Sequence, residues 1–254
     1  MFIHNINPVL LKLGFLEIRY YSLAYIIGFL IAYFVLLQVA KENKVKNLTK
    51  DSVEDFMIYL ILGSVIGGRV LNFVFYQPQV FWTNPLEILM IWHGGMSFHG
   101  GLIGAIIGYF LFRRKHKVAF YDLADNLMIP LAFALFLGRI ANFINGELWG
   151  TITNASWCVE FRGAEGCRHP SQLYEAIYSL FIGFILLFMK AKMKLKKGVI
   201  FWSFVLMYGT LRFFVNFVRE DPRWLGISMG QLLSLTMAVI AVVFLWRILR
   251  NRKN

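Results

Sequence analysis

The stretch LMIPLAFALFLG, Leu127 to Gly138, continues directly into RIANFINGELWG, Arg139 to Gly150. Its first half has the apolar character of a helix that crosses a membrane. Its second half brings a cation, two amides and a carboxylate together, namely Arg139, Asn142, Asn145 and Glu147. Ionisable groups at such a depth are costly, so they normally face a polar cavity and belong to a functional site. An arginine there indicates an anionic ligand, and the abundant anion of a bilayer is a lipid phosphate.

The whole chain shares this apolar character. Of its 254 residues, 58% are hydrophobic and only 16% are charged, and the mean hydropathy is +0.61. A soluble domain of this length carries about 25% charged residues. The composition therefore predicts an all-α polytopic membrane protein.

Several apolar runs approach the roughly 20 residues that a helix needs to cross a bilayer. We expect seven transmembrane helices, at approximately Tyr20–Ala40, Phe56–Tyr76, Met96–Phe112, Leu123–Ala141, Ser171–Met189, Val199–Phe217 and Ile227–Trp246. Between the second and the third, Ile88–His93 is interpreted as a short interfacial or re-entrant piece. The glycine-rich backbone that follows it is irregular, which membranes tolerate only beside protein or a wet cavity.

Most of the 26 basic residues follow the odd-numbered segments. They include Lys41, Lys44, Lys46, Lys50, Arg113, Arg114, Lys115, Lys117, Lys190, Lys192, Lys194, Lys196, Lys197, Arg247, Arg250, Arg252 and Lys253. The positive-inside rule assigns these ends to the cytoplasm, with the N-terminus outside and the C-terminus inside. Residues 146–170 are then a small extracytoplasmic head segment. The net charge of +12 is mostly a topology signal, so we expect the lipid bilayer as partner and no nucleic acid.

The two cysteines, Cys158 and Cys167, both lie in this head segment. In an oxidising compartment they could form a disulfide, and the alternative is two free thiols without a role. No third or fourth ligand stands at the spacing of a zinc site, so we expect no metal.

The unusual polar residues lie in the outer halves of the segments or just beyond them. They are Arg69, His99, Arg139, Asn142, Asn145, Glu147, Arg212, Asn216, Arg219 and Glu220. Scattered structural groups would have no reason to share one leaflet, so a single site that opens to the outer leaflet is the simplest interpretation. An anion transporter is the main alternative outside enzymes. It would require polar groups through both leaflets, whereas the inner halves here are almost wholly apolar.

The stretch WHGGMSFHGGLIGA, Trp92 to Ala105, surrounds His99 with glycines. Glycines such as Gly100 and Gly101 let backbone amides approach a phosphate or a glycerol oxygen. His99 could accept a proton near neutral pH. The alternative is a packing patch, because glycine steps also let membrane helices approach one another.

The stretch YGTLRFFVNFVRE, Tyr208 to Glu220, is expected to place Tyr208, Arg212, Asn216 and Glu220 along one stripe of a helix. The planar guanidinium of Arg212 suits two phosphate oxygens. The alternative is that Arg212 forms a structural ion pair with a carboxylate such as Glu147.

Three further segments carry polar residues of interest. GGRVLNFVFY, Gly67 to Tyr76, repeats the spacing of glycine, arginine and asparagine in GRIAN, which suggests that Arg69 also lines the cavity. HPSQLYEA, His169 to Ala176, begins a helix in which Glu175 is either a catalytic group or the structural partner of an arginine. The early tyrosines, Tyr20 and Tyr21, could equally belong to an interfacial belt.

At GRIANFINGELWG, HGGMSFHGG, HPSQLYEA and YGTLRFFVNFVRE, the chain resembles the prolipoprotein diacylglyceryl transferase family. The resemblance runs nearly end to end, with four long motifs in the same order. It implies one membrane-embedded transferase domain, residues 1–254, with seven spans in a bacterial plasma (inner) membrane. It also implies transfer of the diacylglyceryl group of phosphatidylglycerol to the lipobox cysteine of a prelipoprotein, which leaves a thioether and releases glycerol phosphate.

The resemblance also assigns residues. It implies catalytic roles for His99, Arg139, Arg212, Glu147 and Tyr21. With the residue patterns above, it indicates phosphatidylglycerol contacts for Arg139, Asn142, Asn145, Gly150, Tyr208, Arg212, Arg69, Gly100 and Gly101. Two positions depart from the family pattern, where Asn216 replaces the usual glutamate and Ala141 replaces a glycine.

The implied chemistry suits these residue types. The departing phosphate must be neutralised, which arginines can do in a cavity of low dielectric. The attacking sulfur must lose its proton, because the thiolate is the nucleophile. Either His99 or a neighbouring group takes that proton, or an arginine-lined site lowers the thiol's pKa while His99 orients the lipid. We expect no cofactor, since no ligand set for one is present.

Overall fold

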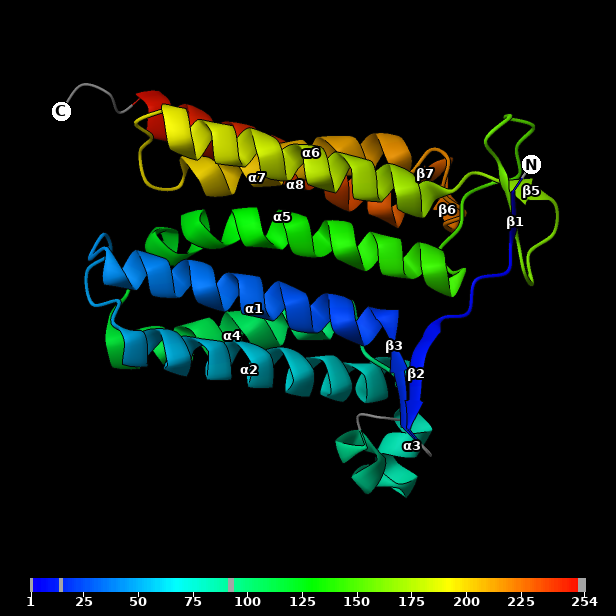
Figure 1. Ribbon diagram of the computed structural model, residues 1–254, viewed down its shortest axis with the longest axis horizontal. Helices are drawn as coiled ribbons and strands as arrows, with labels where there is room; N and C mark the ends of the chain where they lie inside the picture. The colour runs from blue at the N-terminus through cyan, green and yellow to red at the C-terminus, as the bar shows by residue number, and fades with distance from the viewer. Residues whose placement is uncertain (1, 14–15, 91–93, 251–254) are drawn as a thin grey trace. The chain divides into compact units, whose positions relative to one another are not determined.

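The structure is a computed structural model that describes residues 2–13, 16–90 and 94–250 (Figure 1). The chain forms two compact units. The first unit contains residues 1–35 and 121–254, and the second contains residues 36–120. Part of the expected re-entrant piece, residues 91–93, lies outside the described residues.

Each of the seven predicted segments overlaps most of one helix. Five of these helices are long and apolar enough to cross a membrane: α1 (Tyr20–Lys41), α2 (Lys50–Tyr76), α5 (Phe120–Asn145), α6 (Ser171–Lys192) and α8 (Met229–Arg250). Helix α7 (Val199–Val215) is apolar but has only 17 residues, and α4 (Phe98–His116) is rich in glycine and ends in basic residues. The structure confirms a polytopic helical membrane protein, whereas seven spans and their orientation stay predictions.

In the second unit, α2 packs along α4 (Figure 1), and α3 (Pro78–Thr83) and the short helix η1 (Pro85–Leu89) follow α2. Glycines make the close approach of α2 and α4 possible. A Cβ atom on Gly104 would lie 1.9 Å from the carbonyl oxygen of Gly63, and one on Gly100 would lie 2.3 Å from that of Gly67. The contacts of Gly100 are therefore those of the packing alternative. Gly101 is outside this contact, since its Cβ would lie 3.5 Å from the nearest backbone oxygen.

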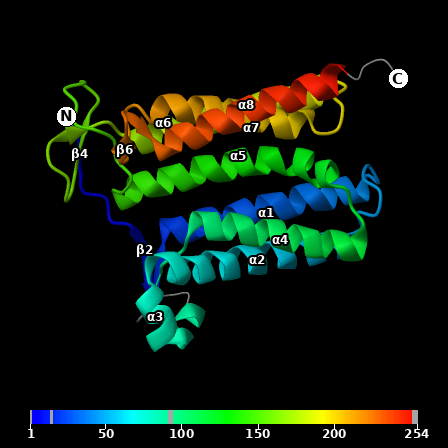
Figure 2. The same cartoon turned by 180° about the vertical axis from the view of Figure 1, so that it is seen from behind.

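In the first unit, α6, α7 and α8 lie side by side (Figure 2), and α5, α6 and α7 share an apolar core. This core contains Ile129, Ala132, Tyr178, Ile182, Leu186, Ile200 and Phe204. At the N-terminus of α7, the carboxylate of Asp125 accepts hydrogen bonds from the backbone N–H groups of Gly198 (2.6 Å) and Phe201 (2.8 Å). Such bonds satisfy donors that a helix leaves unpaired at its N-terminus. They fix the position at which α7 begins relative to α5.

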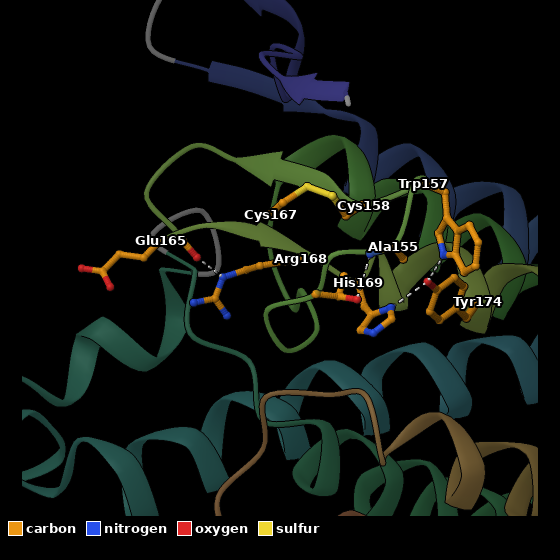
Figure 3. Close-up of a disulfide and its surroundings, with 9 residues drawn as sticks. Ala155, Trp157, Cys158, Glu165, Cys167, Arg168, His169 and Tyr174 are labelled. Atoms are coloured by element: carbon orange, nitrogen blue, oxygen red, sulfur yellow. Dashed lines mark hydrogen bonds between the residues drawn. A yellow bond between two sulfur atoms is a disulfide. The ribbon is translucent and has the colours of Figure 1, made fainter.

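Short strands gather at the opposite end of the first unit. In the head segment, β4 (Val159–Phe161) and β5 (Cys167–Arg168) form an antiparallel pair, and β1 (Phe2–His4) joins β4 in parallel. Two further small hairpins belong to the unit, β2 (Val9–Leu13) with β3 (Leu16–Arg19) and β6 (Arg223–Trp224) with β7 (Ile227–Ser228). Of the two alternatives for the cysteines, the structure has the disulfide: Cys158 and Cys167 are joined across the hairpin, with Cα atoms 5.5 Å apart (Figure 3).

The glycine contact between α2 and α4 gives a test of the second unit. We expect Gly104→Ala to lower the free energy of unfolding by about 1–3 kcal/mol, the usual cost of overpacking, because backbone on both helices must move. Gly101→Ala on the same helix is the matched control. Alanine is the better helix former and meets only ordinary contact there, so stability should hold or rise. Thermal unfolding in detergent measures both, and equal stabilities for the two variants would contradict this packing.

Candidate active site

The carboxylate of Glu175 lies at the centre of the polar cluster in the first unit. Its side chain is fully buried in α6, and three guanidinium groups surround it. Arg139 from α5 donates through Nε at 2.9 Å, Arg219 from the segment after α7 donates through Nη1 at 2.7 Å, and Arg212 from α7 forms the third ion pair. Arginines from α5 and from the region around the end of α7, both distant from Glu175 in the sequence, therefore converge on one buried negative charge.

Further carboxylates lie close to these guanidinium groups. Arg219 also pairs with Asp221, with its Nε 3.1 Å from Oδ2. Arg139 is linked to a third carboxylate, Glu147, through the amide of Asn142. Together with Glu175, three guanidinium groups therefore share three carboxylates, and buried charges are kept only with such partners.

Arg139 and Arg212 are the two arginines that a ligand can reach. Their side chains are 18% and 17% exposed, and both guanidinium groups contact the same oxygen, Oε2 of Glu175. For the Nη2 group of each, we find no hydrogen-bond partner among the described residues. Planar guanidinium groups with donors to spare are the side chains that bind phosphate oxygens best.

The end of α5 continues from Arg139 through two amides to Glu147. Arg139 donates to Oδ1 of Asn142 at 3.1 Å, and Asn142 donates to Oε1 of Glu147 at 2.7 Å. Asn145 donates to the same oxygen at 3.3 Å. The four residues of the opening motif are thus one hydrogen-bonded chain. The structural ion pair that was the alternative for Arg212 is present, but its carboxylate is Glu175 and not Glu147.

Tyr178 and Tyr208 border this cluster, and a second pair of tyrosines lies on α1. Tyr208 stacks on Phe204 with ring centroids 5.7 Å apart and meets Tyr178 edge-on at 5.8 Å. The hydroxyl of Tyr178 donates to Glu175 at 3.4 Å. On α1, the hydroxyl of Tyr25 donates to that of Tyr21 at 3.2 Å. The contacts of Tyr208 fix the orientation of its ring one helical turn from Arg212.

The expected stripe along the late helix is only half present. Tyr208 and Arg212 lie on α7, but the helix ends at Val215 and Asn216 is its C-cap. The backbone then turns, so Glu220 lies beyond the helix and forms an ion pair with Arg168. The prediction failed here because the segment after Val215 forms backbone hydrogen bonds with the head segment instead of continuing the helix.

Gly150 occupies a crowded place in the backbone. Its N–H donates to the carbonyl of His169 at 2.9 Å, and a Cβ atom would lie 2.4 Å from the carbonyl oxygen of Val218. Only glycine allows two chain segments to approach this closely. The structure therefore gives Gly150 a packing role, and its contact with lipid stays a prediction.

The second unit holds the remaining candidates, Arg69, His99, Gly100 and Gly101. Arg69 is 2% exposed, and its guanidinium donates to the backbone carbonyls of Glu87, Ile88, Met90, Gly94 and Gly95. A guanidinium has five N–H donors, so this arginine fixes the segment before α4. His99 is exposed at the start of α4, beside the ring of Phe98. Direct contact of these residues with lipid stays a prediction.

The sequence places Arg219 among the polar residues of the single site without a role, and leaves Glu175 open as a catalytic group or as the structural partner of an arginine. The structure pairs Glu175 with three arginines. A glutamate inside an apolar helix is a usable signal, because a charge there implies a partner. The contact of Arg219 with Glu175 has no local signal, since Arg219 follows the helix and the turn of the chain after Val215 is not evident from the sequence. Among the described residues, no group of three or more histidine, cysteine, aspartate or glutamate side chains gathers as a metal site would require.

The buried charge of Glu175 gives a stability test. Glu175→Gln keeps the shape of the side chain but leaves three guanidinium groups without their shared partner, so we expect a loss of about 3–5 kcal/mol in the free energy of unfolding. Glu17→Gln is the matched control. Glu17 also pairs with two cations, Lys12 and Arg19, but it is exposed, so stability should be unchanged. Thermal unfolding of both variants decides, and equal stabilities would contradict the central role of Glu175.

Comparison with known proteins shows the family of this chain. The family model for prolipoprotein diacylglyceryl transferase matches residues 8–247. Three similar proteins are each named phosphatidylglycerol–prolipoprotein diacylglyceryl transferase. The one from Ehrlichia ruminantium (strain Gardel) is 42% identical over 95% of this chain and 96% of its own length. The one from Geobacter sulfurreducens is 41% identical over 94% of both chains, and the one from Phenylobacterium zucineum is 37% identical over 97% and 94%. The chain therefore belongs to the prolipoprotein diacylglyceryl transferase family.

Proposed function

We propose that this protein transfers the diacylglyceryl group of phosphatidylglycerol to the lipobox cysteine of prelipoproteins, the first step of bacterial lipoprotein maturation. The names of its relatives state both substrates. The observation that carries the proposal is the pair Arg139 and Arg212. Both are partly exposed and both are held on one oxygen of the buried Glu175.

In the proposed reaction, the thiolate sulfur attacks the saturated glycerol carbon that bears the phosphate. The carbon–sulfur bond forms as the carbon–oxygen bond breaks, and the electron pair leaves with the phosphate oxygen of glycerol phosphate. Charge develops on that oxygen in the transition state, so Arg139 and Arg212 accelerate the step by binding it there. Glu175 orients both guanidinium groups before substrate arrives and keeps their mutual repulsion low.

The proton of the thiol needs an acceptor. We assign His99 as the base on the strength of its sequence motif, with Glu147 and Tyr21 as further catalytic groups. Glu147 is linked to Arg139 through Asn142. An anion that binds at Arg139 is therefore coupled to the orientation and protonation of the Glu147 carboxylate. In the competing assignment, the arginine-lined site lowers the thiol's pKa and His99 orients the lipid.

The remaining site residues complete the proposed lipid site in different ways. Asn142, Asn145 and Tyr208 surround the arginines within the first unit, where they would contact the headgroup. Gly150, Arg69, Gly100 and Gly101 are also assigned to phosphatidylglycerol. For Gly150, Arg69 and Gly100, the contacts described above favour an indirect contribution through the backbone.

We propose that both units work as one membrane-embedded transferase, residues 1–254, with 146–170 as a head insertion. The match of one family model to residues 8–247, which span both units, supports this. We also propose seven spans in the bacterial plasma (inner) membrane, with the N-terminus outside and the C-terminus in the cytoplasm. The basic flanks support this orientation. The disulfide in the head supports an oxidising compartment on the other side, so that the site opens to the outer leaflet.

The transfer itself is the test. We expect purified protein in micelles that contain phosphatidylglycerol to release glycerol phosphate when a lipobox peptide is added, and the mass of the peptide to rise by one diacylglyceryl group. Arg212→Lys should lower kcat about 10²–10³-fold, as loss of a preorganised donor does, because lysine lacks the planar fork. Arg247→Lys, the same change in the last turn of α8, should keep wild-type turnover.

A peptide with serine in place of its cysteine is the control for the nucleophile. Release of glycerol phosphate with that peptide, or no release with either peptide, would contradict the proposed transfer. Wild-type turnover by Arg212→Lys would contradict the assigned role of the guanidinium.

A second substitution separates the two roles of His99. If His99 is the base, His99→Gln should lower kcat by about 10²-fold or more, the usual worth of general base catalysis, and raising the pH to increase the thiolate fraction should recover part of the loss. If His99 only orients the lipid, KM for phosphatidylglycerol should rise, and raising the pH should not restore activity. Turnover at the wild-type rate would rule out both roles.

A further inference from the structure

A ladder of backbone hydrogen bonds joins the head segment to the segment that carries Arg219. Within the head segment, residues 150–153, here called the central segment, form the middle of this ladder. The N–H of Thr151 donates to the carbonyl of Val218 at 2.8 Å, and Gly150 pairs with Arg219 in an antiparallel bridge. On the other side, the N–H of Gly150 donates to the carbonyl of His169 at 2.9 Å. The position of Arg219 is therefore set by the head as well as by α7.

The side chain of Arg168 contacts both sides of this ladder and stabilises it. It is 7% exposed and comes from β5 (Figure 3). Its Nη1 donates to the carbonyl of Gly150 at 3.2 Å and forms an ion pair with Glu220, and its Nε donates to the carbonyl of Glu165 at 2.9 Å. The indole N–H of Trp149 donates to the same carboxylate of Glu220 at 3.0 Å. One buried guanidinium thus ties the central segment to the residue that follows Arg219.

The hairpin that presents Arg168 is itself held firmly. Cys167, the residue before Arg168, is bonded to Cys158, the residue before β4 (Figure 3). A disulfide reduces the freedom of the chain that it closes, so β5 offers a fixed base for the arginine. Arg219 in turn lies between Val218 and Glu220, which the central segment and Arg168 hold. Its guanidinium contacts Glu175, the residue that orients Arg139 and Arg212.

We propose that Arg168 is a positioning residue of the transfer reaction. Through Gly150 and Glu220 it fixes the segment that carries Arg219, and through Arg219 it fixes the arrangement of guanidinium groups around Glu175. This proposal rests on the proposed function of that cluster. Catalytic groups must be held in the productive geometry, and displacements of about 1 Å can cost 10²-fold in rate. Loss of Arg168 therefore lowers kcat more than it raises KM.

The first test reads the structural link without any substrate. In purified full-length protein, Arg168→Met should raise the rate of amide hydrogen exchange in residues 149–153 and 217–221. Arg162→Met is the matched control, because Arg162 is an exposed arginine in the same hairpin, and exchange there should equal that of wild type. Unchanged exchange in Arg168→Met would overturn the proposal.

The second test is a double-mutant cycle on kcat with Arg168→Met and Arg219→Lys. Each change alone should lower kcat tenfold or more. If Arg168 acts through Arg219, the double variant should be no more than about twofold slower than the slower single variant, since coupled sites are not additive. Losses that multiply, or wild-type kcat in Arg168→Met, would overturn the proposal.

A milder variant covers the case in which Arg168→Met does not fold. Glu220→Gln releases the same ion pair from its exposed partner, since that side chain is 54% exposed, and it should lower kcat in the same direction while Tm stays unchanged. Wild-type kcat in this variant would count against the proposal. If wild-type protein transfers nothing while exchange still responds to Arg168→Met, the proposed function fails and the link from Arg168 to Arg219 stands.

Discussion

The first unit depends on the burial of a single carboxylate, that of Glu175. A buried charge without partners is too costly to keep, so α5, α7 and the segment after α7 each supply an arginine to it. The result is a cluster of cations that would repel one another without Glu175. The proposed anion site is therefore a consequence of how the fold satisfies one acidic residue inside a membrane protein.

The arginines of this protein fall into two kinds, which the number of satisfied donors distinguishes. Arg69 is buried and donates only to backbone carbonyls, so it supports a segment of chain. Arg139 and Arg212 are partly exposed, and each uses only part of its donor set within the described residues. A guanidinium binds a ligand with the donors that the protein leaves over. Similar sequence motifs around Arg69 and Arg139 thus lead to different physical roles.

Close backbone approach is the second constraint on this fold, and glycine meets it in both units. Gly104 lets α2 and α4 pack in the second unit, and Gly150 lets the head segment pair with the chain after α7. The disulfide and Arg168 then make that pairing rigid. In the proposed mechanism, stability and catalysis are linked here, because the backbone contact that closes the head also sets the position of Arg219.

The sequence by itself determined the helical membrane class, the seven helical segments, the cluster Arg139–Asn142–Glu147 and the family. These follow from apolar runs and local motifs, which depend on residues near one another in the chain. Only the tertiary structure decided that Arg212 pairs with Glu175, that α7 ends before Glu220, and that Arg69 is satisfied by backbone. These outcomes rest on contacts between distant segments, where the cost of an unpaired buried charge or donor selects the partner, and no local pattern records that choice.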